Sequence, residues 1–331
     1  MPVGHFAMGL IRWMTQKDPK QRMKMSEIFS YLKLSQPVTS ANLKTVLDSR
    51  NRTKTIQFSK THYVDGGGYG SVYLGRCEIS GSDIIVVKRV QWLEGSQAEA
   101  INRELTALKK LNHTNIVKFF DSALDDDFIH IGMEKCLTSL DLYCRKPLLY
   151  HGIIPMPSEQ QVLLQMAEGL HYIHSQIVNG SQRLIHRDVK PGNILISCDN
   201  PSVIKWADFG LSRAVVTGSK SFTWSKLKGT DRWLAPELIH QDLKTKVRGS
   251  QSCDVFALGC VFFFYLTQGL HPFGDGDKDF VQFNIKNANS VNKNKLSNEH
   301  FAFHIIEKMI QSDPHKRPKM SVVVAELKTI W

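Results

Sequence analysis

The chain has 331 residues, of which 42% are hydrophobic and 22% are charged, and its formal net charge is +11. These values are typical of an ordinary folded protein and exclude a chain dominated by disorder. The sequence contains no run of five like charges and no basic repeat interleaved with aromatic residues, so we attribute the charge to a solvated, lysine-rich surface and do not expect nucleic acid as a partner.

The cysteines and the apolar segments indicate in which cellular compartment the protein is expected. The six cysteines form no Cys-x-x-Cys pair and no metal-ligand spacing with the 13 histidines, as is typical of reduced thiols. The apolar run 255–266 is shorter than the roughly 20 residues that span a membrane, and the N-terminus lacks the charged-then-apolar pattern of a signal peptide. The sequence therefore predicts no membrane segment and a cytoplasmic protein.

Residues 1–54 are expected to form an N-terminal extension. Within it, residues 14–32 match residues 309–327 at a constant offset and share Met, Gln, Asp, Pro, Arg, Lys, Met, Ser and Leu at equivalent positions. We interpret residues 14–32 as a second copy of the segment at 309–327. The alternative is an unrelated amphipathic helix with apolar residues at helical spacing, namely Ile11, Met14, Ile28, Tyr31 and Leu32. Residues 33–55 are rich in Ser, Thr, Asn and Lys and predict a linker.

From residue 55 to residue 74 the pattern alternates as in strands and is interrupted by a glycine-rich stretch. Glycines let backbone amides approach phosphate oxygens closely, so this stretch is a candidate nucleotide loop, and a simple glycine-rich hairpin is the alternative. The candidate nucleotide-binding residues are Val64, Asp65, Gly66, Gly67, Gly68, Tyr69, Gly70, Ser71 and Val72.

Residues 84–90 predict an apolar strand that contains Lys88, and residues 98–111 predict a helix. A lysine in a buried strand needs a partner, because burying an unpaired ammonium is costly, and Glu104 in the helix is the expected one. The alternative is a pair of surface charges. Further strands are expected at 115–120 and 128–133, with a solvated acidic turn at 125–127. A helix is expected at 158–175, with Ser158 as its N-cap.

The stretch from Ile185 to Asn193 carries the polar groups that phosphoryl transfer from a metal-bound nucleotide needs. Asp188 can take a hydroxyl proton, Lys190 follows two residues later, and Asn193 follows five residues later. A second acidic residue, Asp208, comes after a short predicted hairpin and is followed by Phe and Gly. The order and spacing of these residues are specific evidence for such a site, although either stretch alone, 185–193 or 208–210, would be weak evidence.

This pattern resembles the H-R-D-x-x-x-x-N and D-F-G motifs of the eukaryotic protein-kinase family. The resemblance implies an α+β, two-lobed protein-kinase fold over residues 55–331. In that family the segment equivalent to 309–327 closes the C-lobe, so the repeat at 14–32 resembles the tail of a kinase C-lobe. The expected fold has a small N-lobe at 55–133, made of an antiparallel β-sheet with one helix, then a hinge at 134–138 and a larger, mainly helical C-lobe at 139–331. The resemblance also implies ATP and Mg²⁺ as cofactors. A lysine two residues after the catalytic-loop Asp, as in Lys190 after Asp188, is typical of serine/threonine kinases.

Residue roles follow from the same resemblance. Asp188 would accept the hydroxyl proton and Lys190 would steady the transferring phosphoryl group; Asn193 and Asp208 would hold magnesium. Lys88 would bind the α/β-phosphates, with Glu104 holding it in place. Backbone groups at Met133, Glu134 and Cys136 would meet the adenine. The chain departs from the family at Asp65, which occupies the place of the first loop glycine and puts a carboxylate near the nucleotide.

The segment after Asp208 is rich in hydroxyl residues, and Ser221, Thr223 and Ser225 are the expected regulatory phosphosites. Arg187 could pair with a phosphate added there; polar loop filler is the alternative. Two structural roles are also expected. Asp254 should bond the backbone of the catalytic loop, and Arg317 should pair with Glu237 in a buried ion pair.

Several stretches resemble the kinase half of the unfolded-protein-response kinase/endoribonuclease family, namely 86–90, 131–136, 253–260 and 271–274. That family carries a lumenal sensor, a membrane helix and a ribonuclease domain, none of which we expect in this chain, so RNA cleavage is not expected. The favoured function is a serine/threonine kinase that acts on protein substrates and self-associates for trans-autophosphorylation. The alternatives are a nucleotide-binding pseudokinase or scaffold and a basic RNA-associated regulator.

Overall fold

The computed structural model describes residues 42–49, 55–67, 70–77, 85–92, 105–106, 108–152, 154–178, 182–208, 213–216, 231–239 and 250–329. The chain divides into two compact units. The N-terminal unit comprises residues 1–112, 117–136 and 148–153, and the C-terminal unit comprises residues 113–116, 137–147 and 154–331. The main change from one unit to the other, at residues 136 and 137, falls within the range for which a hinge is expected.

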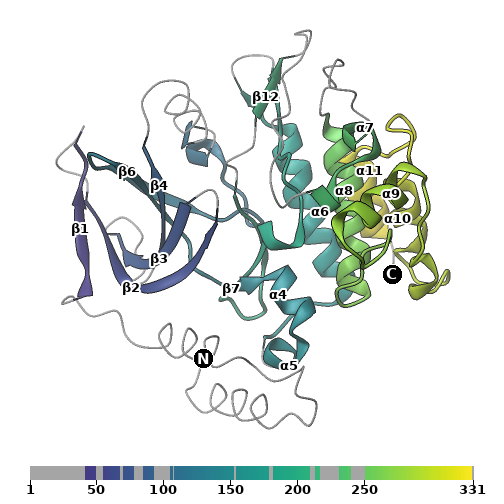
Figure 1. Ribbon diagram of the computed structural model, residues 1–331, viewed down its shortest axis with the longest axis horizontal. Helices are drawn as coiled ribbons and strands as arrows, with labels where there is room; N and C mark the ends of the chain where they lie inside the picture. The colour runs from purple at the N-terminus through teal and green to yellow at the C-terminus, as the bar shows by residue number, and fades with distance from the viewer. Residues whose placement is uncertain are drawn as a thin grey trace. The chain divides into compact units, whose positions relative to one another are not determined.

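The N-terminal unit is built on one antiparallel sheet with the strand order β1-β2-β3-β4-β6-β5 (Figure 1). Its strands are β1 (Lys44–Leu47), β2 (Thr55–Gly67), β3 (Gly70–Arg76), β4 (Ile85–Gln91), β5 (Phe119–Leu124) and β6 (Phe128–Met133). Residues 105–106 and 108–110 are helical. The expected strands at 84–90 and 128–133 are therefore confirmed, and the expected helix at 98–111 is confirmed for residues 105–106 and 108–110.

Alternation along the strands gives this sheet two apolar faces. One face carries Phe58, Ile85 and Val87, which cluster with other buried residues of the unit. The opposite face carries Ile129 and Ile131, which pack with a cluster that includes Leu105 and Leu124. The helical segment that contains Leu105 therefore covers the same face as Ile131.

Two predictions for strands and linkers are wrong. Residues 44–47, expected within a linker, form β1 and pair with β2, because Val46 is buried among the apolar residues of the sheet. The strand expected at 115–120 begins only at Phe119. The carbonyl of Asn115 accepts a hydrogen bond from the Trp206 amide at 2.9 Å, so residues 113–116 are held by the C-terminal unit instead.

Outside this sheet the chain is mainly helical. Its helices are α4 (Leu140–Arg145), α5 (Pro147–Tyr150), α6 (Glu159–Ser175), α7 (Pro236–Ile239), α8 (Gln251–Leu266), α9 (Lys278–Lys286), α10 (Phe303–Met309) and α11 (Met320–Thr329). Two small sheets have the orders β11-β10-β7 and β12-β9-β8. Their strands are β7 (Cys136–Ser139), β8 (Ile177–Val178), β9 (Gln182–Ile185), β10 (Ile194–Ser197), β11 (Ile204–Trp206) and β12 (Arg213–Val216). Short 3-10 turns are η4 (Pro191–Asn193), η5 (Asp231–Trp233) and η6 (Lys293–Lys295).

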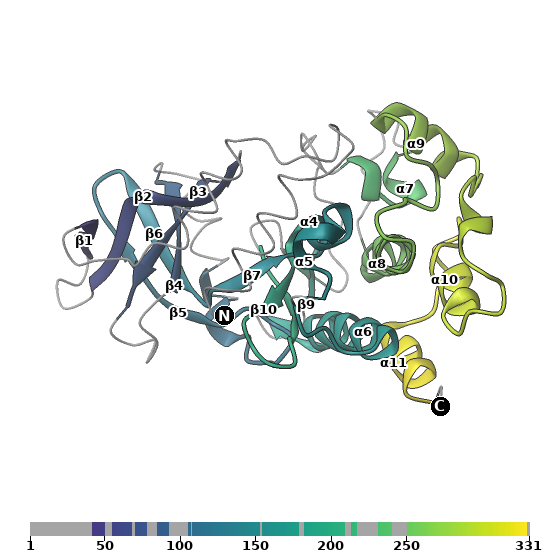
Figure 2. The same cartoon turned by 90° about the horizontal axis from the view of Figure 1, so that it is seen from below.

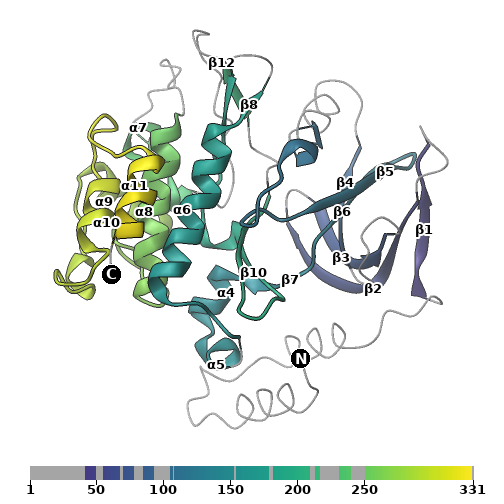
Figure 3. The ribbon, with the colours of Figure 1, turned by 180° about the vertical axis from the view of Figure 1, so that it is seen from behind.

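The core of the C-terminal unit forms around α8. This helix is apolar on all sides and is buried from Cys253 to Tyr265, as expected of a helix enclosed by others. Helix α10 packs on α8 (Figure 2), and α11 packs along α6 (Figure 3). The predicted start of α6 is confirmed, since Ser158 Oγ accepts a hydrogen bond from the Gln161 amide at 3.3 Å. Among the described residues, no helix is both long and apolar enough to span a bilayer.

Candidate active site

The loop after β9 and the short turn η4 that follows it bring three of the predicted site residues close together. The Asp188 side chain is 2% exposed, and its Oδ2 atom lies 2.7 Å from Lys190 Nζ. The Asn193 side-chain amide Nδ2 donates to the same Oδ2 at 2.8 Å and to the Asp188 carbonyl oxygen, also at 2.8 Å. A cation and an amide thus fix one oxygen of a buried carboxylate.

The other carboxylate oxygen of Asp188 is differently placed. Oδ1 is buried and accepts no hydrogen bond from any residue that the structure describes. A buried carboxylate oxygen normally has a donor, so an open one is a candidate for contact with a substrate. Because Oδ2 is held and Oδ1 is open, the carboxylate presents one defined atom that can take a proton.

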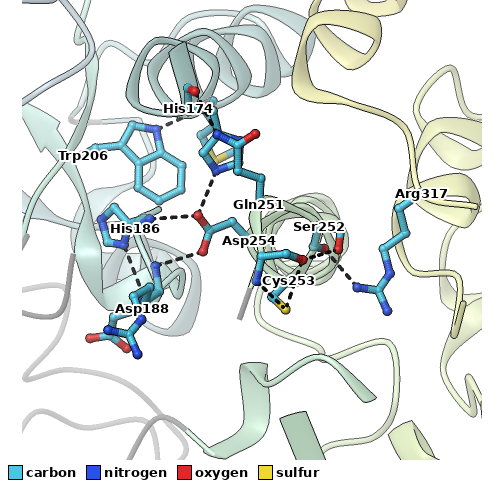
Figure 4. Close-up of polar contacts among 12 residues, drawn as sticks. His174, His186, Asp188, Trp206, Gln251, Ser252, Cys253, Asp254 and Arg317 are labelled. Atoms are coloured by element: carbon cyan, nitrogen blue, oxygen red, sulfur yellow. Dashed lines mark hydrogen bonds and ion pairs between the residues drawn. The ribbon is translucent and has the colours of Figure 1, made fainter. Parts of the chain in front are cut away.

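Asp254 anchors the backbone of this loop (Figure 4). The carboxylate, on α8, accepts hydrogen bonds from the His186 amide at 2.8 Å, the Arg187 amide at 2.9 Å and the His174 ring at 2.8 Å. Burial alone would raise the pKa of Asp254, but the hydrogen bond and the charge of His174 hold it below its usual value. The predicted bond from Asp254 to the catalytic loop is confirmed, and the contribution of His174 was not predicted.

His186 and Trp206 connect the loop to the strand that leads to Asp208. The His186 ring lies 3.2 Å from the Ala207 carbonyl oxygen, and its Nδ1 accepts the Asp188 amide at 3.4 Å. Burial lowers the pKa of His186, so a neutral ring can donate on one side and accept on the other. The Trp206 ring packs 5.0 Å from it and donates to the Met166 carbonyl at 3.0 Å. Sequence reasoning missed Trp206, because no motif spacing marks it.

The two predicted magnesium ligands lie on neighbouring segments. The amide of Ala207, directly before Asp208, donates to the Asn193 carbonyl oxygen at 2.9 Å. Asp208 has a φ of 58°, an uncommon value for a residue with a side chain. Because Nδ2 of Asn193 faces Asp188, its Oδ1 is the amide atom that remains for a cation. A carboxylate with an amide oxygen is the kind of donor set that Mg²⁺ prefers, so the residues fit this metal.

Lys88 and the glycine-rich stretch lie on the sheet of the N-terminal unit. Val72 of β3 is paired with Asp65 of β2 on one side and with Lys88 of β4 on the other. Since directly paired residues point to the same face, the three side chains form a row on one face of the sheet. Gly70 has a φ of 123°, and a Cβ there would lie 2.4 Å from the Arg89 carbonyl oxygen, so the hairpin requires glycine at this position.

Of the remaining predicted site residues, the structure describes those expected at the hinge, and the others lie outside the described residues. Met133 ends β6 and Cys136 begins β7, while the Glu134 carboxylate accepts the Lys118 amide at 3.1 Å. Gly68, Tyr69, Glu104, Ser221, Thr223, Ser225 and the repeat at 14–32 lie outside the described residues. The pairing of Lys88 with Glu104 therefore stays a prediction.

The predicted ion pair between Arg317 and Glu237 is confirmed. Two guanidinium nitrogens of Arg317 each donate to one carboxylate oxygen of Glu237 at 2.8 Å, and the arginine side chain is fully buried. Cys253 adds a thiol hydrogen bond to the same carboxylate at 3.1 Å. Burial alone would raise the pKa of Glu237, but its bonds to Arg317 hold it below the usual value.

Comparison with known proteins agrees with this geometry. Residues 58–327 match the family model described as "Protein kinase domain". The chain is 30% identical to "Sensor for unfolded proteins in the ER ire1" of Schizosaccharomyces pombe, over 93% of this chain and 29% of that protein. It is 30% identical to "MAP kinase kinase kinase wis4" of the same organism, over 80% and 19% of the two chains, respectively. It is also 33% identical to human "Serine/threonine-protein kinase/endoribonuclease IRE2", over 63% and 22%.

The alignments cover less than a third of each of these relatives. The matches confirm the predicted resemblance to protein kinases, including those of the kinase/endoribonuclease type, and the predicted two-lobed fold. The chain belongs to the protein kinase domain family.

Proposed function

We propose that this protein is a serine/threonine kinase that transfers the γ-phosphate of ATP to protein hydroxyls, including those of its own activation segment, which is the hydroxyl-rich segment after Asp208. The observation that carries the proposal is the state of the Asp188 carboxylate. Its Oδ2 is held by Lys190 and Asn193, while its buried Oδ1 accepts no bond from the part of the chain that the structure describes.

In this proposal Asp188 Oδ1 accepts the proton of the substrate hydroxyl as the hydroxyl oxygen bonds to the γ-phosphorus. The bond from that phosphorus to the bridging oxygen breaks, and ADP leaves. Lys190, beside the carboxylate, offers positive charge to the transferring group. Asp208 and Asn193 would hold Mg²⁺, which neutralises phosphate charge when bound.

The other predicted site residues would bind the nucleotide. Lys88 would contact the α/β-phosphates, and Glu104 would hold the lysine. The backbone at the end of β6 and the start of β7 would meet the adenine. The glycine-rich hairpin of β2 and β3 would cover the phosphates, with Gly70 allowing its tight return.

Lys190, which follows Asp188 by two residues, supports serine and threonine as the acceptor residues, and so does the similarity to a human protein named as a serine/threonine-protein kinase. Protein substrates follow from the family. Self-association would let one copy phosphorylate the activation segment of another, at Ser221, Thr223 or Ser225.

Incubation with Mg-ATP, followed by phosphosite mapping by mass spectrometry, tests the proposal. The wild type should gain phosphate on Ser221, Thr223 or Ser225, and Asp188→Asn should gain none, because the amide cannot take the proton. Thermal unfolding of both proteins checks that the variant is folded. Phosphate on neither protein, with a folded wild type and a generic protein substrate also present, would contradict kinase activity.

A pseudokinase is the second candidate, and one observation favours it. Asp65 puts a carboxylate in the glycine-rich hairpin and accepts the Gly66 amide at 2.8 Å. This feature works against phosphate binding. Retention of nucleotide without phosphotransfer in the same assay would select the pseudokinase.

A further inference from the structure

We propose that Asp65 makes the nucleotide site discriminate by charge, so that it favours nucleosides and metal-complexed nucleotides over metal-free triphosphates. This inference rests on the nucleotide site of the proposed function and adds a specificity-determining residue to it. Three observations carry it, namely the register of the hairpin, the hydrogen bond of the carboxylate, and its position relative to Lys88.

The register directs Asp65 toward the face that carries Lys88. Tyr63 pairs with Tyr73 and Asp65 pairs with Val72, so Val64 is one extra residue on β2. A bulge of this kind changes which side chains share a face, and such bulges re-aim residues beside functional sites. After the bulge, Asp65 stands in one row with Val72 and Lys88. Without the extra residue, the alternation of β2 would place Asp65 on the opposite face.

The hydrogen bond of Asp65 removes a donor from the hairpin. Its Oδ1 accepts the Gly66 amide at 2.8 Å. In a glycine-rich loop that covers phosphates, the backbone amides are the groups that bind the phosphate oxygens. One such amide is therefore occupied by a carboxylate of the chain itself. A phosphate that approaches Gly66 meets a negative charge in place of a free donor.

The distance to Lys88 sets the size of the effect. Neighbouring strands lie about 4.8 Å apart, so Asp65 and Lys88, two strands apart, have Cα atoms about 10 Å apart. Phosphates held at Lys88 would lie within about one Debye length of the Asp65 charge. Asp65 is exposed, so the repulsion is screened, and we expect about a two- to fourfold loss of affinity per added negative charge close to it.

Two substitutions separate the charge from the hydrogen bond. Asp65→Asn keeps an Oδ1 acceptor for the Gly66 amide and removes the charge, whereas Asp65→Gly removes both. The matched control is Asp126→Asn, an exposed carboxylate on the turn between β5 and β6. Asp126 has no place in the proposed site, so its replacement should leave every affinity unchanged.

The experiment measures dissociation constants for adenosine, ADP and ATP with a chelator present, for the wild type and the three variants. We expect Asp65→Asn to leave adenosine unchanged and to improve binding progressively from ADP to ATP, by about tenfold for ATP at low salt. The improvement should shrink in 1 M salt, where the Debye length is about 3 Å. Addition of Mg²⁺ should narrow the difference between the wild type and Asp65→Asn for ATP.

Each other outcome counts against the inference. Equal changes for all three ligands would assign Asp65 a structural role in the hairpin. An improvement with Asp65→Gly but not with Asp65→Asn would assign the effect to the occupied amide and would overturn discrimination by charge. Adenosine binding by the wild type shows that the nucleotide site exists; if neither the wild type nor any variant binds any of the three ligands, the proposed function fails together with the inference.

Discussion

His271 is a buried histidine in the C-terminal unit whose ring contacts aromatic side chains. Its Nδ1 accepts the Phe273 amide at 3.2 Å, and its ring lies 4.8 Å from that of Trp233. Burial, with the nearby charge of Arg232, lowers the pKa of His271 to about 3. The histidine is therefore neutral in the folded protein at physiological pH.

This pKa predicts a loss of stability in mild acid. Below the unfolded value of 6.5, the unfolded state binds the proton and the folded state does not until about pH 3. His271 should therefore reduce the free energy of unfolding by about 2 kcal/mol between pH 7 and pH 5. Chemical denaturation at both pH values should show that His271→Asn loses less unfolding free energy than the wild type between pH 7 and pH 5. Part of the loss should remain in the variant, because His186 is also buried and has a lowered pKa.

The control for this measurement is His315→Asn, which replaces an exposed histidine. The decrease in the unfolding free energy of this variant between pH 7 and pH 5 should equal that of the wild type. If His271→Asn kept the full wild-type loss, the histidine would have to be protonated, or accessible to water, in the folded state.

At the scale of elements, α6 and β11 meet where Gly169 faces Trp206. A Cβ at Gly169 would lie 2.3 Å from the Trp206 ring and 3.0 Å from the Asn115 carbonyl oxygen. The helix therefore keeps a glycine at this position, although alanine has the higher helix propensity, by about 1 kcal/mol. This close approach lets the Trp206 ring reach the Met166 carbonyl and pack beside His186.

Gly169→Ala should destabilise the protein by about 1–3 kcal/mol, because the clash outweighs the gain in helix propensity. The same substitution in a Trp206→Leu background should cost much less, since a smaller side chain leaves room for the methyl group. A double-mutant cycle of unfolding free energies measures the difference. Equal costs in the two backgrounds would mean that the ring is not what excludes the methyl group.

The elements also show how far sequence reasoning reached. Local signals predicted the Ser158 cap and the strands around Lys88, and motif spacing brought Asp188, Lys190 and Asn193 together. The pattern failed at β1, where a single buried residue, Val46, holds a polar segment on the sheet. It also failed to identify Trp206 and His174, because their roles depend on partners far away in the chain.

At the scale of the whole molecule, the Arg317 guanidinium joins segments that are distant in sequence. Besides Glu237 in α7, it donates to the carbonyl oxygens of Ser252, Gln311 and Ser312. Its donors are therefore paired with the start of α8 and with the turn that leads to α11. Removing the arginine would leave a half-buried carboxylate and several carbonyl oxygens without their donor.

Arg317→Ala should lower the free energy of unfolding by about 3–5 kcal/mol, because breaking a buried ion pair leaves one charge uncompensated. The control is Lys308→Ala, which removes an ion pair with Glu326 in which both side chains are substantially exposed, and which should cost about 0–1 kcal/mol. Chemical denaturation measures both.

The pH dependence identifies the carboxylate involved. In the wild type, the lowered pKa of Glu237 gives stability that is fully present above the unfolded value of 4.5 and is lost as the pH falls through the folded value. Without Arg317, burial raises the pKa of Glu237, so this contribution reverses sign and the variant gains relative to the wild type as the pH falls toward 4.5. A constant difference between wild type and Arg317→Ala from pH 7 to pH 4 would show that the ion pair is not the source of the cost. The cost would then come from the lost hydrogen bonds to carbonyl oxygens and from lost packing against Phe256, whose ring lies 5.0 Å from the guanidinium carbon.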